Sequence, residues 1–200
     1  MTNTRPNEEG TSEPLPLPAQ VNPDSCDSFN SLMVVNKRAD GSYFKSWAES
    51  KVDLPAGAVF ARINGITPTS KQDYATTQSG PDMHFVFNSD LYYCNHSCAP
   101  SLECDTSTWE IRVSRKRPLR KGDVLSLFYP STEWTMNREF ECWCGAGKGI
   151  CCGIIKGARD MDDRDLERYW LNDFIHELRK QETRTRNSLG VTGNGDLREA

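Results

Sequence analysis

The stretch YYCNHSCAP, Tyr92–Pro100, places two cysteines, a histidine and a serine within nine positions. Such residues can form a nucleophile with its base, half of a metal site, or a loop that binds with its backbone. A Cys–His nucleophile is disfavoured, because Cys94 or Cys98 lies two residues from His96. On an extended strand such residues stand side by side and do not meet head-on. A metal-ligand role fits Cys98 better.

A second group of cysteines lies in ECWCGAGKGICCG, residues 141–153. Tetrahedral zinc takes four soft ligands, and glycine-rich turns let a short peptide wrap around an ion. Cys142, Cys144 and one of the neighbours Cys151 and Cys152 supply three ligands, and both neighbours binding one ion is geometrically awkward. Four cysteines within eleven residues favour zinc over a set of buried thiols. The fourth ligand must come from elsewhere, and the candidates are Cys94, Cys98, Cys104 and Cys26.

Composition limits the partners and the compartment. The net charge is -4, so no overall field draws the chain toward nucleic acid or an anionic membrane. The basic patch at 112–121, RVSRKRPLRK, follows a strand-like segment and contains a turn, which favours a solvated hairpin end. No segment approaches the roughly twenty apolar residues of a membrane helix, and the start MTNTRPNEEG lacks the apolar region of a secretory signal. We expect a cytoplasmic or nuclear chain with reduced cysteines, no membrane association and no direct nucleic-acid binding.

One folded domain is expected, between a disordered leader over 1–27 and a disordered tail over 183–200. The polar stretch 67–81 predicts a loop or one helical turn at most. Leucine and aromatic residues at helical spacing predict one helix over 160–180. Short segments rich in branched and aromatic residues predict strands. These are SLMVV (31–35), GAVFARI (57–63), HFVFN (84–88), LYYC (91–94), WEIRVS (109–114) and DVLSLFY (123–129).

Three separated stretches together resemble a known family. NHSCAPS (95–101), GDVLSLFYP (122–130) and CWCGAGKGICCG (142–153) resemble, in order and spacing, the SET-domain methyltransferases with a cysteine-rich post-SET zinc segment. The resemblance covers about 29–153, weakly so at the front.

The resemblance implies a mainly β fold with a defined order of parts. A SET-domain β-clip would occupy 28–141, with the Asn-His stretch and the tyrosine strand threaded together as a pseudoknot. The post-SET zinc segment would occupy 142–153, and a C-terminal helix would lie within 154–182.

The resemblance also implies a binding loop and a cofactor. By the family's pattern Asn95 and His96 bind S-adenosylmethionine, largely through backbone and amide groups. Tyr129 matches the tyrosine at the methyl-transfer site, and it also borders the cofactor. The other implied roles are Trp143 over the adenine, Tyr43 and Phe44 at the front edge of the cofactor pocket, and Cys98, Cys142, Cys144 and Cys151 on a structural zinc.

Two departures from the family bear on the methyl acceptor. A tyrosine that often lines the lysine channel is replaced by Ile63, and the insert that shapes peptide recognition shrinks to 67–81. A lysine amine must lose a proton and then carry charge, so its channel benefits from aromatic and hydroxyl partners. A carboxylate is already ionised at neutral pH and needs no base. The sequence therefore narrowly favours O-methylation of a small-molecule acceptor such as a carboxylic acid.

Two other functions stay open. Methylation of a protein lysine is the closest alternative, because it is the usual activity of the implied fold and a fold does not fix function. A catalytically silent, zinc-stabilised binding module is the third. The presence of Tyr129 together with Asn95 and His96 counts against that module.

Overall fold

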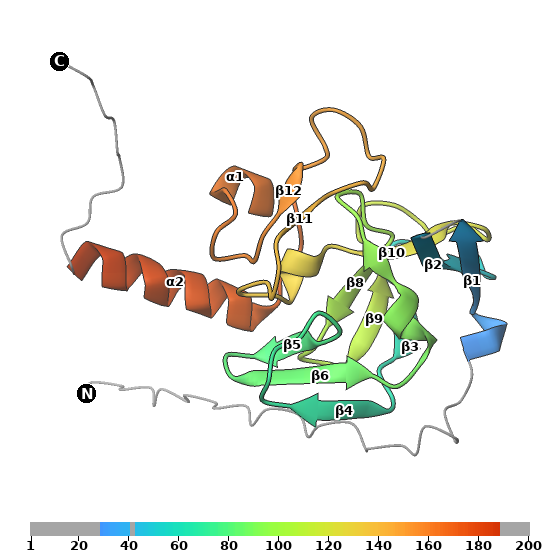
Figure 1. Cartoon of the computed structure of the whole chain (residues 1–200), viewed down its shortest axis with the longest axis horizontal. Coiled ribbons are helices and arrows are strands. Elements are labelled where there is room, and N and C mark those ends of the chain that lie inside the picture. Colours follow the sequence, from blue (N-terminus) through green and yellow to red (C-terminus); the bar gives the residue numbers. More distant parts are fainter. Residues whose placement is uncertain (1–28, 41–42, 189–200) are drawn as a thin grey trace, which may run out of the picture.

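The computed structural model describes residues 29–40 and 43–188, and it is mainly β with few helices (Figure 1). The predicted leader lies outside the described residues. The strands are β1 (Met33–Asp40), β2 (Tyr43–Ser50), β3 (Val59–Arg62), β4 (Ile66–Thr69), β5 (Thr77–Gly80), β6 (Met83–Phe87), β7 (Asn95–His96), β8 (Leu102–Asp105), β9 (Glu110–Val113), β10 (Val124–Leu127), β11 (Phe140–Glu141) and β12 (Ile154–Ile155). The helices are the short 3-10 turns η2 (Phe29–Ser31), η3 (Asp90–Tyr93) and η4 (Tyr129–Ser131), and the α-helices α1 (Asp163–Leu166) and α2 (Asp173–Ser188).

The strands form four small sheets, in the orders β1-β2-β10-β7, β3-β9-β8, β4-β6-β5 and β11-β12. Strand β10 matters most for the site, because it pairs antiparallel with β2 and parallel with β7. The parallel pairing places Asn95 opposite Ser126 and His96 opposite Leu127. The Asn-His stretch and the strand that leads to Tyr129 therefore lie side by side, although about thirty residues separate them in the sequence.

The core is formed in part by two predicted strands, β9 and β10, and by β8, which was not predicted. Leu102, Ile111, Val113 and Leu125 are fully buried and come from β8, β9 and β10. Fully burying such a side chain contributes roughly 1.5–3 kcal/mol relative to leaving it exposed. This core anchors β10, the strand that leads to Tyr129.

Two local predictions were wrong. The stretch 67–81 is not a loop, since it holds most of β4 and all of β5, which are the two edges of the β4-β6-β5 sheet. Edge strands need no apolar alternation and tolerate proline. The sequence of this stretch, with Pro68 and many polar residues, therefore did not indicate strands. LYYC is not a strand but belongs largely to η3, where the N–H of Cys94 donates to the carbonyl of Leu91.

The predicted helix over 160–180 is interrupted. It forms α1 and α2, and α2 runs on to Ser188, beyond the predicted start of the tail. The break lies before Asn172, which is buried and donates to the carbonyls of Cys104 and Ser131, both at 2.9 Å. Its Oδ1 accepts from the backbone N–H and the hydroxyl of Thr106. These tertiary bonds outweigh helical periodicity.

Neither α-helix in the described part of the chain is long and apolar enough to cross a membrane.

The basic patch at 112–121 lies at the end of β9 and in the turn that follows. Arg112 pairs with Glu110, Arg115 pairs with Glu103, and Arg117 pairs with Asp123 at 2.9 Å. These arginines are thus engaged by carboxylates of the same molecule.

Candidate functional site

Tyr129 lies directly against the Asn-His stretch. Its hydroxyl donates to the carbonyl of Cys94 at 3.4 Å, and its backbone N–H donates to Nδ1 of His96 at 3.3 Å. The rings of Tyr129 and Phe140 meet the His96 ring edge-on, with centroids 5.4 and 5.6 Å away. The amide of Asn95 donates to the carbonyl of Ser46 in β2 at 2.6 Å, which fixes its side chain. Two separate segments therefore contact the tyrosine, and β2 is bonded to the first of them.

Burial sets the protonation of this group. It lowers the pKa of His96 to about 4, so the imidazole is neutral and its Nδ1 can accept the N–H of Tyr129. Burial also raises the pKa of Tyr129 well above its ordinary value. At neutral pH Tyr129 is therefore a hydroxyl that orients hydrogen bonds, and it does not act as a base.

A cavity of about 370 Å³ opens beside Tyr129. Its walls come from the loop between β4 and β5, from η3 and β7, from the segment after β10, and from the residues that lead into β11. Aromatic side chains form much of the lining, namely Tyr74, Phe87, Tyr92, Tyr129 and Phe140. The volume is within the range of small-molecule sites.

A buried carboxylate lines the same cavity. Glu133 is 7% exposed, and its Oε1 accepts the backbone N–H of Gln78 at 3.0 Å. Its own backbone N–H donates to the carbonyl of Tyr129 at 3.0 Å, so the carboxylate is held one turn from the tyrosine. Burial raises the pKa of Glu133 to about 7, against hydrogen bonds that lower it. Glu133 forms no ion pair with any residue in 29–40 or 43–188.

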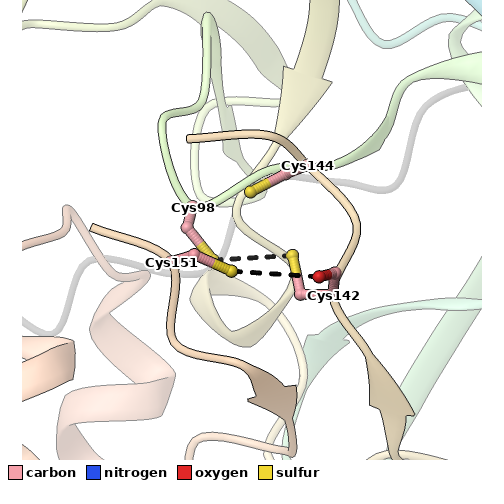
Figure 2. Close-up of side chains that lie close together, drawn as sticks. All are labelled: Cys98, Cys142, Cys144 and Cys151. Atoms are coloured by element: carbon pink, nitrogen blue, oxygen red, sulfur yellow. Dashed lines mark hydrogen bonds between the residues drawn. The ribbon is translucent and has the colours of Figure 1, made fainter. Parts of the chain in front are cut away.

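Four thiols gather next to this loop. The Sγ atoms of Cys98, Cys142, Cys144 and Cys151 all lie within 4.8 Å of one another and point toward a common centre (Figure 2). The Cys98 and Cys142 sulfurs are 3.7 Å apart. A tetrahedron with Zn–S bonds of about 2.3 Å has sulfurs about 3.8 Å apart, so the donor set fits a four-thiolate metal site. Cys98 comes from the Asn-His loop, and the other three come from the glycine-rich segment.

The local fold brings these thiols together. Strands β11 and β12 pair antiparallel and close the segment between them, and the N–H of Cys142 donates to the carbonyl of Gly153 at 2.7 Å. Within it Gly145, Gly147 and Gly149 have φ values of 71°, 87° and 86°. Residues with a side chain rarely adopt this left-handed conformation, so the glycines allow the tight path around the cluster.

Cys152 lies outside the cluster. Its Sγ faces the guanidinium of Arg168 at 3.3 Å and the hydroxyl of Tyr169 at 3.9 Å, while its backbone N–H donates to the sulfur of Cys98. Cys151 is the neighbour that joins the other three thiols. The cluster therefore takes one of the two adjacent cysteines, as the geometry of neighbours requires.

The remaining implied residues are less constrained. Trp143 lies between two cluster cysteines, but its side chain is 86% exposed. Tyr43 and Phe44 begin β2, and their side chains lie outside the described part of the structure. Ile63 is 1% exposed, packs in the main core and is not among the residues that line the cavity. Ile63 therefore does not line this cavity, and its correspondence with a channel tyrosine stays a prediction.

The sequence analysis missed several cavity residues. Tyr92 and Phe140 were not assigned to the site, although both line the cavity. Glu133 was also missed, and one signal could have found it: it is the first charged residue after the uncharged stretch VLSLFYPST, residues 124–132. A carboxylate in such a setting is unusual in a core and indicates a function.

Comparison with known proteins places this chain among the methyltransferases. It is 52% identical over 131 residues to a protein of Aspergillus flavus named methyltransferase flvH, a match that covers 66% of this chain and 72% of the relative. The chain therefore belongs to that methyltransferase family. No protein-family model matches the chain.

Proposed function

We propose that this chain is an S-adenosylmethionine-dependent methyltransferase of the SET type that acts on a small-molecule acceptor. The observation that carries the proposal is that Asn95 and Tyr129 line one cavity, with His96 holding the backbone N–H of Tyr129 from behind. Membership of a methyltransferase family agrees with it.

The residues around the cavity suit methyl transfer. S-adenosylmethionine, when bound, supplies a methyl group on a positively charged sulfur. Asn95 and His96 would hold it through backbone and amide groups. The hydroxyl of Tyr129 and the carbonyl of Cys94 place oxygen atoms at one point of the wall, and oxygen dipoles stabilise a methyl carbon that becomes partly positive. Positioning of the acceptor supplies much of the remaining rate enhancement.

Zinc would have a structural role here. Four thiolates fill a tetrahedral site and leave no open position for catalysis. Cys98 lies two residues after His96, so a zinc ion would link residues 142–153 to the binding loop. The Cys144 thiol ionises most readily: burial raises its pKa, but hydrogen bonds from Cys98, Ala146 and Cys142 lower it to about 7. Burial raises the pKa of the Cys98 and Cys142 thiols, so the charge of a bound metal ion would have to favour their thiolate forms.

The size and charge of the cavity bear on the class of methyl acceptor. The cavity volume suits a small molecule. A carboxylic acid is the acceptor that the sequence favours, and a protein lysine is the alternative. The buried carboxylate of Glu133 opposes the acid, because two carboxylates in one enclosed space repel.

Titration calorimetry with S-adenosylmethionine tests the cofactor. We expect binding of one cofactor per chain, and weaker binding by the Asn95→Ala variant, which loses the amide that Ser46 fixes. The Asn187→Ala variant, changed on the exposed end of α2, is the matched control and should bind as the wild type does. Absence of binding heat in the zinc-loaded wild type would contradict the proposal.

A further inference from the structure

Glu133 is the least expected group in the cavity. Buried carboxylates are normally paired with a cation, because the uncompensated charge is costly. Glu133 has no such partner in the described part of the chain. Its hydrogen bonds come from neutral groups, namely the backbone N–H of Gln78 and the side chains of Gln72 and Thr132. The other charged residues of the cavity, Asp73 and Arg138, are exposed at its rim.

We propose that Glu133 selects a small amine as the methyl acceptor, by pairing its carboxylate with the acceptor's ammonium group. This inference rests on the proposed function, and it revises the acceptor class that the sequence favours. The missing cation of the buried carboxylate would then be the substrate itself. The aromatic rings of Tyr92 and Phe140 line the same space, and aromatic faces also attract an alkylammonium ion.

Glu133 is also placed to accept the proton that the acceptor ammonium must lose. An ammonium has no lone pair, so it must lose a proton before it can attack. The Glu133 carboxylate takes that proton, and its pKa of about 7 is suited to a base near neutral pH. The nitrogen lone pair then forms a bond to the methyl carbon as the carbon–sulfur bond breaks, and the electron pair of that bond stays on sulfur. The positive charge moves from sulfur to nitrogen, so atoms and charge balance.

An acid acceptor would use the site differently. Its carboxylate would require Glu133 to be protonated, or it would have to bind at the rim near Arg138. In either case removing the charge of Glu133 would leave acid binding unchanged or improve it. The two acceptor classes therefore predict opposite effects of one substitution.

The test is a thermal-shift titration of the zinc-loaded full chain with two probe series, the n-alkylamines and the n-alkanoates of the same chain length. S-adenosylhomocysteine is present at saturation, and its own affinity is measured for every variant. The variants are Glu133→Gln, which keeps the shape and the acceptor for Gln78, and Glu139→Gln, an exposed carboxylate outside the cavity. Methyl incorporation from labelled S-adenosylmethionine is measured on the same samples.

Amines should raise the melting temperature of the wild type and of Glu139→Gln, and alkanoates should not. Glu133→Gln should bind the amines roughly 10- to 100-fold more weakly, the range expected for losing a charge-assisted bond. Its affinity for S-adenosylhomocysteine should be unchanged. Stabilisation by alkanoates, equal amine binding by Glu133→Gln, or no amine binding by the wild type would each overturn the inference. If S-adenosylhomocysteine does not bind, the proposed function fails, and the amine titration without it still decides the role of Glu133.

Discussion

The Cys151→Ser variant should purify without stoichiometric zinc, whereas the Cys152→Ser variant should keep about one zinc ion per chain. The two residues are neighbours, so the pair is closely matched in position and chemistry. Only the Cys151 sulfur joins those of Cys98, Cys142 and Cys144, while the sulfur of Cys152 faces Arg168. Elemental analysis of the purified proteins measures the difference directly.

The loss of local structure in Cys151→Ser should be large, because few other interactions stabilise the segment that the metal would organise. Residues 142–153 contain no strand or helix, and none of them is buried. Binding of a structural zinc supplies on the order of 10 kcal/mol, which is folding free energy for such a segment. We therefore expect Cys151→Ser, and chelation of the wild type, to expose this segment to protease and to abolish cofactor binding. Equal zinc content in the two serine variants would show that the cluster is not the metal site.

The Tyr129→Phe variant should lose roughly 100- to 1,000-fold in turnover and keep its affinity for S-adenosylmethionine. The substitution removes one oxygen and leaves the ring in its place between His96 and Phe140. Removing a single preorganised polar group at a reacting centre typically costs this much in rate. Single-turnover kinetics and cofactor titration on the same sample separate the two effects.

The matched control is Tyr93→Phe, because Tyr93 is the neighbouring tyrosine of η3 and does not line the cavity. It should turn over as the wild type does. If Tyr129→Phe retained full turnover, Tyr129 would be only a core aromatic at a strand end. If it lost cofactor affinity in proportion to turnover, its role would be in binding and not in methyl transfer.

The features that the sequence predicted well depend on strong local chemistry. The strands with buried branched residues, such as β9 and β10, agree with their predicted positions. The cysteine cluster could be predicted from the sequence because cysteines at short spacing, in a chain expected to keep them reduced, favour metal binding. The choice between Cys151 and Cys152 needed three dimensions, since it depends on which sulfur turns toward Cys98.

The features that the sequence did not predict depend on tertiary contacts. The two polar edge strands form because β6 lies between them. The predicted helix is interrupted because Asn172 bonds to Cys104, Thr106 and Ser131. The burial of Ile63 could not be read from spacing alone, because Ile63 lies just after β3, where the alternation of strand faces no longer applies. The role of Glu133 could not be predicted because it depends on the fold, which bonds Glu133 to Gln78 and Tyr129 and places its side chain on the cavity wall.

The most direct test of the central claim is methyl transfer itself. Purified zinc-loaded protein is incubated with S-adenosylmethionine labelled in its methyl group and with a cell extract separated into macromolecules and small metabolites. The proposed function predicts label in the small-metabolite fraction, lost with Tyr129→Phe, and an amine acceptor predicts that the label resists mild base. Label in protein bands that resists mild base would contradict a small-molecule acceptor and indicate lysine methylation, and no label in either fraction would contradict the account as a whole.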